Sequence, residues 1–389
     1  MRHCTFFLLF LLMLAACGKT IVVDPEMPDP EEPSSPIPLE GVAKLLSSLP
    51  IGPEQMSEVA DAVNSSAGNG YDCEYTMQQL FSSPGSGIGE TEGTKAGKYS
   101  TPLRDLIADA VRTSTRAGEP LYGDPEDYLA ALSASDLQIY WPYADSWNGS
   151  EAPVITFDPG NDSDVNTGYV LQPDGSVSEM IVGEDVAQER PVWVINRNTD
   201  SEYKSLEMLR REDPNWGNGG GNITITPRGK STEAKTLVIK TLCLDHQFDS
   251  WFAGGSELMF KMGAVESFKA SSEAELRNYK PTVTDFLIVV KRGEVGITLP
   301  INTIMVSEWT KDLQSCAFMI HEDDGGAQDK WKCSAIVKWN SKSYGFETEL
   351  PIRTRDDIVW RGQLTRSFVE KFSGKLAMFG EVGLVMELI

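Results

Sequence analysis

The feature that most constrains the fold is a period of two in the last part of the chain, from Lys235 to Ile389. Apolar and polar residues alternate there in short runs that turn residues separate, and such alternation is typical of half-buried β-strands. A series of short strands of this kind indicates a β-sandwich over 230–389, with one helix over 365–372. The expected strands are 236–244, 257–262, 286–292, 303–309, 316–321, 330–339, 344–350 and 382–388.

A second set of alternating runs lies between residues 137 and 196, separated by Asn, Asp and Gly turns. It predicts a small antiparallel β-domain over 136–229. A helix is expected at 202–211, and the glycine-rich stretch 215–222 is expected to lead into a strand at 223–226. This stretch is not a phosphate-binding loop, because no Gly-Lys-Ser/Thr sequence follows it.

From 39 to 135 the apolar residues instead recur every three or four positions, which predicts small amphipathic helices. Pro53 is placed to begin one helix, Asp72 to cap the next, and Pro102 to begin a third, with a fourth over 125–132. The glycine-rich stretch 83–97 is expected to be a flexible loop. The expected fold class is therefore α+β and mainly β: a helical N-terminal region over 39–135, then the small antiparallel β-domain and the C-terminal β-sandwich.

The start of the chain predicts its location. A short basic head and an apolar run from 6 to 14 precede the sequence Leu-Ala-Ala-Cys, which ends at Cys17. The run is too short to span a bilayer comfortably, and the small residues after it mark a cleaved export signal over 1–16. The pattern resembles the lipobox of bacterial lipoproteins, which implies that Cys17 is lipidated and becomes the new N-terminus. An ordinary secretory signal with a chance cysteine is the alternative.

Residues 17–38 are acidic and rich in proline, so they predict an extended, solvated tether rather than part of a core. The formal net charge is −23, or −24 once the signal with Arg2 is removed. A charge of this sign repels phosphate backbones, which argues against nucleic acid as a partner. It also disfavours contact with an anionic membrane surface, so we expect the membrane to be reached through the N-terminal lipid alone.

Four cysteines remain beyond Cys17, without CxxC or zinc-ligand spacing. Export permits disulfides, and Cys316 and Cys333, which flank an expected hairpin, are the best candidate pair. Four unpaired, buried thiols are an equally open alternative. The remaining cysteines are Cys73, Cys243, Cys316 and Cys333.

The middle and end of the chain resemble a group of largely uncharacterised, Bacteroidetes-type envelope lipoproteins. The matching stretches are DLQIYWPYADSW, GYVLQPDGS, PVWVINRN and DHQFDSWFAGGSELMFKM. The resemblance covers roughly two-thirds of the chain. It implies a lipid-anchored outer-membrane protein without an assigned activity, whose C-terminal sandwich is similar to C2 domains. Acidic residues soon after the lipidated cysteine accompany surface export in many such lipoproteins. Gly-Lys-Thr-Ile follows Cys17 here, so the periplasmic and extracellular faces stay open.

Two acidic loops are candidates for calcium, the one cofactor that the sequence suggests. Oxygen ligands at every second residue of a curved loop are typical of calcium sites, although the glycine and glutamate of an EF-hand are absent from the first loop. Its candidate ligands are Asp158, Asp162, Asp164 and Asn166. The second loop is the turn 321–326, with Asp329 beyond it; C2-like sandwiches bind calcium with such loops. Solvated turns are the alternative for both.

Catalytic residues are few. His246 lies near Cys243, Asp249 and Ser250, but no GxSxG motif occurs and a structural hydrogen bond is the commoner role at a strand end. Zinc is disfavoured because there is no HExxH motif. Glycosidase chemistry needs only two placed carboxylates, so the acidic composition neither excludes it nor argues for it.

An aromatic cluster offers the best candidate binding site. Trp141, Tyr143 and Trp147 follow Tyr140, and stacked rings of this kind can hold a sugar ring or a peptide edge. The alternative is that Trp141 fills the core, as large aromatic residues usually do. Trp251 has the same ambiguity.

The sequence therefore predicts a lipid-anchored envelope protein that acts by binding, with a protein or glycan as partner. An exported hydrolase acting on glycan or peptide substrates is the alternative, and a structural subunit of an envelope assembly is a third. The oligomeric state stays open.

Overall fold

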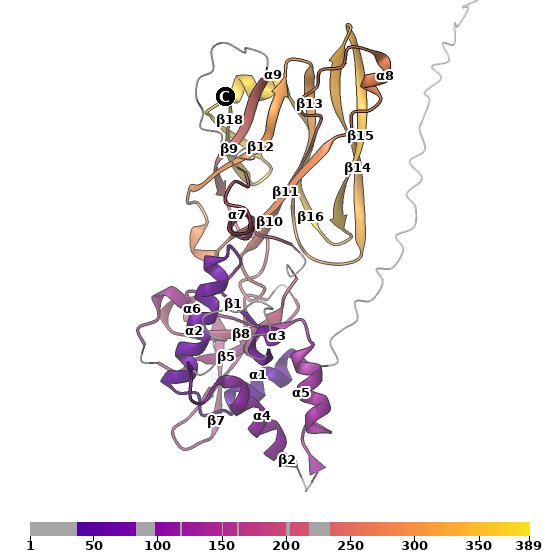
Figure 1. The fold of residues 1–389 in the computed structure, drawn as a ribbon. Coiled ribbons are helices and arrows are strands. Elements are labelled where there is room, and N and C mark those ends of the chain that lie inside the picture. The colour runs from indigo at the N-terminus through magenta and orange to yellow at the C-terminus, as the bar shows by residue number, and fades with distance from the viewer. Residues whose placement is uncertain are drawn as a thin grey trace, which may run out of the picture.

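Two layered bodies lie end to end in the structure, a computed structural model that describes residues 37–82, 98–116, 119–149, 151–161, 163–199, 203–217 and 234–389. We call residues 37–199 the N-terminal half and residues 234–389 the sandwich; Figure 1 shows the first below the second. The signal, Cys17, most of the tether, the loop 83–97, Asp162 and the strand expected at 223–226 lie outside the described residues. Among the described residues, no helix is both long and apolar enough to cross a membrane.

A six-stranded sheet forms the centre of the N-terminal half, in the order β1-β4-β8-β5-β6-β7. Helices cover one of its faces, and local signals set their ends. Thr76 caps α3 and Asp124 caps α5, each accepting backbone N–H groups of the first turn.

The strands are β1 (Glu74–Thr76), β4 (Leu137–Tyr140), β5 (Val154–Phe157), β6 (Val165–Leu171), β7 (Val177–Gly183) and β8 (Val192–Arg197). A separate ribbon contains β2 (Thr115–Arg116) and β3 (Glu119–Pro120). The helices are α1 (Leu39–Ser47), α2 (Pro53–Gly68), α3 (Met77–Phe81), α4 (Leu103–Thr113), α5 (Pro125–Ser133), η2 (Ala144–Ser146) and α6 (Glu184–Glu189).

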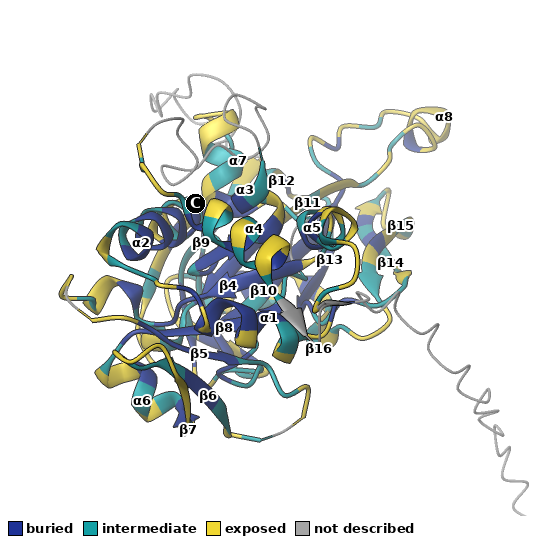
Figure 2. Cartoon of the chain, turned by 90° about the horizontal axis from the view of Figure 1, so that it is seen from below, coloured by how far each residue is buried: buried dark blue, intermediate teal, exposed yellow. Residues whose placement is uncertain are grey.

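The two faces of this sheet have different partners. Ile139, Trp193 and Ile195 point toward the helices and join their apolar stripes in one core, so the helices in Figure 2 are buried where they face the strands and exposed on the far side. Tyr140 and Val194, one residue away in each strand, point to the opposite face. That second face is covered by residues of the sandwich, as described below.

The sheet differs from the expected antiparallel β-domain in two ways. It is mixed, because β5 and β8 run parallel. Parallel neighbours need a long crossover, and residues 158–191 with the β6–β7 hairpin and α6 supply it. In addition, β1 comes from the region expected to be helical, and the helices share a core with the strands. The regions 39–135 and 136–199 therefore pack as one unit.

Glu58 is a buried acid in the contact between α2 and α4. Its side chain is 2% exposed and accepts a 2.6 Å hydrogen bond from the backbone N–H of Leu103, at the start of α4. Burial raises the pKa of Glu58 to about 7, with smaller increases from Asp105 and Glu54, while the Leu103 N–H and Arg104 act in the opposite direction.

This raised pKa predicts a pH-dependent stability. Between the unfolded-state pKa of 4.5 and about 7, the unfolded chain loses the Glu58 proton while the folded chain keeps it. Glu58 therefore makes the protein less stable as the pH rises through this range, by on the order of 3 kcal/mol. In Glu58→Gln this part of the slope should disappear. Urea unfolding of both proteins at several pH values measures it, and equal slopes would contradict the assignment.

The sandwich consists of two antiparallel sheets that face each other across a shared core. One sheet has the order β11-β10-β13-β14-β15, with β16 also pairing β13, and the other has the order β12-β9-β18-β17. Phe318 of β13 meets Phe379 of β17 edge-on across the core, with ring centroids 5.5 Å apart. The strands are β9 (Ala234–Leu244), β10 (Ser256–Ala264), β11 (Thr282–Val290), β12 (Leu299–Thr310), β13 (Leu313–Glu322), β14 (Gln328–Trp339), β15 (Lys342–Arg353), β16 (Asp357–Thr365), β17 (Leu376–Phe379) and β18 (Val382–Leu388). The helices are α7 (Leu206–Glu212), which precedes the sandwich, α8 (Glu273–Leu276), η3 (Arg292–Glu294) and α9 (Arg366–Phe372).

The predicted sandwich is confirmed, and so is the helix at 365–372, which is α9. Two strands, β16 and β17, go beyond the prediction, because their apolar residues form short continuous runs, Ile358 to Trp360 and Leu376 to Phe379, without the alternation that marks a half-buried strand. Cys316 and Cys333 do not pair, and all four described cysteines are free. Cys316 lies in the core between the sheets, whereas Cys333 packs beside Met319 on the outer face of β13, so the strand itself separates the two thiols.

A candidate metal centre at the junction of the two halves

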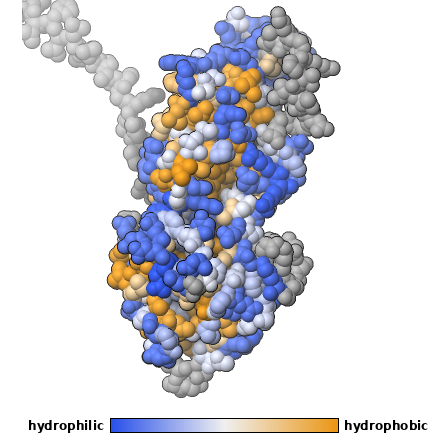
Figure 3. Space-filling model, turned by 90° about the vertical axis from the view of Figure 1, so that its left-hand side faces the viewer, coloured by the Kyte–Doolittle hydropathy of each residue, from blue (hydrophilic) through white to orange (hydrophobic). Residues whose placement is uncertain are grey.

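The two halves are joined by a loop of the sandwich that lies against the N-terminal sheet. We call residues 245–255, between β9 and β10, the junction loop. Trp251 and Phe252 at its tip are almost fully buried and pack with Val154, Val192 and Val194 on the sheet face opposite the helices. Figure 3 shows the molecule narrowing between the halves, with mainly hydrophilic side chains visible around this waist. The junction loop is thus covalently part of the sandwich and packs as part of the N-terminal half.

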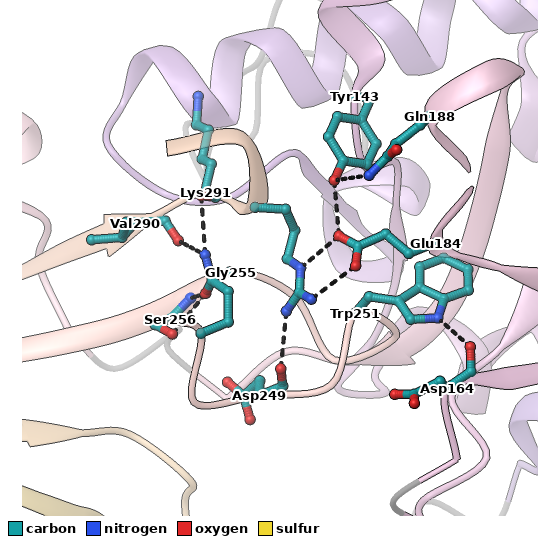
Figure 4. Close-up of polar contacts among 12 residues, drawn as sticks. Tyr143, Asp164, Glu184, Gln188, Asp249, Trp251, Gly255, Ser256, Val290 and Lys291 are labelled. Carbon is teal, nitrogen blue, oxygen red and sulfur yellow. Dashed lines mark hydrogen bonds and ion pairs between the residues drawn. The ribbon is translucent and has the colours of Figure 1, made fainter. Parts of the chain in front are cut away.

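Hydrogen bonds fix the junction loop to the N-terminal half at several points. The Trp251 indole Nε1–H donates to the carbonyl of Asp164 at 2.9 Å (Figure 4). The Asn196 side-chain amide donates to the carbonyls of Phe252 and Ala253, at 2.9 and 2.7 Å. Asp72, expected to cap a helix, instead accepts the backbone N–H of Gly255 at 2.7 Å. The loop therefore has little freedom relative to the N-terminal sheet.

An arginine of the sandwich strengthens this junction. Arg292 forms a bidentate ion pair with Glu184 of α6, at 3.0 and 3.1 Å, and donates to the main-chain carbonyl of Asp249 at 2.9 Å (Figure 4). The Tyr143 hydroxyl donates to the same Glu184 carboxylate at 2.8 Å. Burial alone would raise the pKa of Glu184, but the hydrogen bonds from Arg292 and Tyr143 lower it overall. This carboxylate is therefore charged and fully engaged with its partners.

A second set of carboxyl groups lies beside the junction loop and lacks such compensation. We call Asp249, Glu322 and Asp324 the acidic cluster. A ligand oxygen from each of the three lies within 4.8 Å of the others. Asp249 comes from the junction loop, while Glu322 ends β13 and Asp324 follows it. Three carboxylates from two parts of the chain thus converge on one point, as the ligands of a hard cation do.

Glu322 is the member that most needs a partner. It is 1% exposed, and its Oε1 accepts the backbone N–H of Glu257 at 3.1 Å. Its Oε2 is buried and has no hydrogen-bond donor among the described residues, and one of the two Glu322 carboxyl oxygens lies within 4.8 Å of oxygens of Asp249 and Asp324. Burial and the neighbouring Asp249 raise the pKa of Glu322 far above its usual range. Buried carboxylate oxygens are normally paired, so this one requires either a bound cation or a shared proton.

The surroundings of the acidic cluster add to its negative potential. Burial raises the pKa of Asp249, and the charges of Asp158 and Asp357 raise it further; a hydrogen bond shared with Glu322 and the charge of Arg292 act in the opposite direction. Burial and Asp249 likewise raise the pKa of Asp324, to about 6. Asp249 and Asp324 are only half-buried, so the cluster is open to solvent on their side. The exposed parts of Asp249 and Asp324 are therefore the side from which a cation would enter.

The alternation of side chains in β13 separates this cluster from a second buried polar group. His321 and Asp323 point to the other face, where His321 Nδ1 lies 2.8 Å from Asp356 and Arg353 lies 3.9 Å from Asp323. Burial lowers the pKa of His321 although Asp356 opposes the shift. On this face of β13, the acids Asp323 and Asp356 therefore lie beside Arg353 and the imidazole of His321. The candidate cation site therefore includes Glu322 and Asp324 of the predicted turn 321–326 but not Asp323.

The first predicted calcium loop does not assemble into a site of its own among the described residues. Asn166 donates to the carbonyl of Phe157 and accepts the N–H of Thr167, so its side chain is occupied within the sheet. Asp158 accepts the N–H of Gly160, and its charge acts on Asp249 of the acidic cluster. Asp164 contributes its backbone carbonyl to Trp251, Asp162 lies outside the described residues, and Asp329, which was named with the second loop, is exposed.

The aromatic residues predicted to bind a ligand are divided between core and junction. Trp141 is 1% exposed, and Trp147 and Trp193 pack against it with ring centroids 5.6 and 6.0 Å away. The hollow beside them measures about 30 Å³, which is room for a few water molecules and too small for a sugar ring. Trp141 therefore has no free ring face for a sugar, and Tyr143 instead holds Glu184. His246 is exposed, with its ring 5.6 Å from that of Phe248.

Three residues of the junction were not identified as site residues from the sequence: Asp249, Glu184 and Arg292. Asp249 was noted only as a neighbour of His246, and nothing in the local pattern connects it with Glu322, which lies far along the chain. Comparison of the chain with protein-family models, with curated proteins and with solved structures found no match.

Proposed function

We propose that this chain is a lipid-anchored envelope protein that acts by binding, and that its folded part holds a divalent cation, Ca²⁺, in the acidic cluster. The observation that carries the second part is the buried Oε2 of Glu322, which lacks a donor among the described residues and belongs to a carboxyl group beside those of Asp249 and Asp324. Bound Ca²⁺ would satisfy this oxygen and neutralise the cluster at the same time.

The chemistry of the ligands favours calcium over other metals. All three are carboxylates, which suit hard cations, whereas zinc and copper prefer imidazole and thiolate. Ca²⁺ accepts six to eight oxygens in flexible geometry, so water and neighbouring oxygens can complete its shell. Mg²⁺ demands a stricter octahedron and gives up its water reluctantly. The half-buried Asp249 and Asp324 are placed to receive the ion first, with Glu322 beneath them.

The proposal is tested by thermal unfolding with and without millimolar Ca²⁺. A ligand that binds only the folded state raises the melting temperature, by an amount equivalent to about 2.7 kcal/mol at a hundredfold excess over Kd. Asp324→Asn should reduce the rise strongly. Asp329→Asn is the matched control, because Asp329 is an exposed aspartate that accepts the backbone N–H of its neighbour Lys330 and lies outside the acidic cluster. An unchanged melting temperature of the wild type in Ca²⁺ would remove the proposal.

The anchor is supported by the sequence around Cys17, which resembles a lipobox and precedes an acidic, proline-rich stretch. Cells that express the full chain and receive a labelled fatty acid should incorporate the label into the protein. Cys17→Ala should abolish the incorporation and leave the protein without a membrane anchor, while Cys73→Ala should retain the label. Labelling that persists in Cys17→Ala would show that the anchor is wrong.

Hydrolysis is a second candidate function because of the same carboxyl groups. A buried acid with a raised pKa beside another carboxyl group is the arrangement that general acid catalysis uses, and glycosidases need two such groups. However, Glu322 is 1% exposed, so a substrate would meet Asp249 and Asp324 first. Cation binding requires no access for a large molecule and is therefore preferred. Glycan cleavage by the wild type that Glu322→Gln abolishes in the absence of Ca²⁺ would reverse this preference.

A further inference from the structure

All three residues of the acidic cluster belong to the sandwich, but one of them lies on the segment that packs against the N-terminal half. Asp249 lies on the junction loop, whose tip is buried in the N-terminal half through Trp251 and Phe252. Glu322 and Asp324 lie at the end of β13 in the sandwich. An ion held by all three would therefore connect a segment fixed to one half with a strand of the other.

Without a cation, the same contact is unfavourable. Three carboxyl groups with oxygens within 4.8 Å of one another repel when charged, and two of them are also close to Asp158 or Asp357. Other contacts between the halves involve different elements and carry no such conflict. Thr199 donates its hydroxyl to the Glu257 carboxylate at 3.2 Å, and Arg353 donates to the carbonyl of Thr199 at 3.3 Å. The acidic cluster is thus the part of the junction that a cation changes most.

We propose that the cation fastens the two halves together, so that docking of the junction loop against β13 depends on Ca²⁺. This inference rests on the proposed function and goes further, because a cation can bind without altering the junction. Binding neutralises the repulsion between Asp249 and the two sandwich carboxylates. It also holds the junction loop from the sandwich side, in addition to its contacts with Asn196 and Asp72.

Hydrogen exchange of the detergent-solubilised full chain tests this inference, with Ca²⁺ binding measured separately by calorimetry. The reporting amides are those of Phe248, bonded to Ser256 Oγ, and Gly255, bonded to Asp72. Millimolar Ca²⁺ should slow their exchange about tenfold or more, while peptides from β4 and β8 change little. Asp324→Asn should lose the slowing, and the exposed control Asp329→Asn should keep it.

The outcomes separate the two proposals. If Ca²⁺ binds and the exchange of the junction loop does not change, the fastening is wrong and the cation site stands. If Ca²⁺ slows exchange equally in β4 and β8, the ion stabilises the molecule as a whole, and the specific role of the junction is also wrong. If calorimetry detects no binding, both proposals fail.

Discussion

Glu322→Gln is expected to raise the melting temperature of the cation-free protein and to remove the rise that Ca²⁺ gives the wild type. The two effects have opposite signs and one cause. Near pH 7.5, a buried carboxyl with an unfolded-state pKa of 4.5 either remains charged beside two others or takes up a proton, at a cost of up to about 4 kcal/mol. Glutamine avoids this cost but supplies a poorer ligand. The cation-free variant should therefore be the more stable protein by a few kcal/mol.

The test measures four melting temperatures by thermal unfolding: those of the wild type and of Glu322→Gln, each in chelator and in millimolar Ca²⁺. A shared proton between Asp249 and Glu322 would also make Glu322→Gln stabilising, but it predicts no response of the wild type to Ca²⁺. A variant that is less stable than the wild type in chelator would contradict the account, because it would show that Glu322 is already well paired. The exposed acid Glu347, replaced by Gln, controls for the general effect of removing one negative charge.

Trp251→Ala should produce the largest loss of stability at the junction. The Trp251 ring is 3% exposed, its centroid lies 4.0 Å from that of Phe252, and its N–H donates to the Asp164 carbonyl. Replacing a buried tryptophan by alanine typically costs 3–5 kcal/mol, because contacts are lost and a cavity remains. The Trp251 side chain belongs to the sandwich and packs among residues of the N-terminal half, so its removal weakens the contact between the two halves. The variant should therefore also unfold in two separate calorimetric transitions, one for each half.

Trp251→Phe is the matched control, since it keeps a buried aromatic ring and removes the hydrogen bond, which contributes about 1 kcal/mol, together with the smaller part of the indole. It should retain the calorimetric profile of the wild type with a slightly lower midpoint. A loss below 1 kcal/mol in Trp251→Ala, with an unchanged calorimetric profile, would show that the junction loop does not hold the halves together.

Much of the fold was predictable because its signals are local. Alternation over 235–389 identified most strands of the sandwich, and proline and capping residues located the helices that begin at Pro53 and Leu103. Alternation says nothing about which strands become neighbours. The parallel pairing of β5 with β8 and the insertion of β16 beside β13 are decided by tertiary packing, so neither was expected. The apparent boundary at residue 136 marked a change of secondary structure and not a change of core.

The candidate site was predictable only in part, for the same reason. Glu322 and Asp324 belong to an acidic turn that the sequence singled out, and Asp158 belongs to another. Nothing in the residues around Asp249 shows that the loop after β9 enters the N-terminal half and brings this carboxylate to β13. Trp141 illustrates the converse: its neighbours suggested a binding surface, but the helices cover its ring.

Isothermal titration calorimetry of Ca²⁺ into the detergent-solubilised full chain tests the central claim most directly. The account predicts saturable binding at the acidic cluster with a Kd of about 0.1 mM or tighter, weaker binding of Mg²⁺, and loss of this binding in both Glu322→Gln and Asp324→Asn. Asp329→Asn should bind as the wild type does. Absence of binding to the wild type, or equal binding to all four proteins, would contradict the assignment of a cation to Asp249, Glu322 and Asp324.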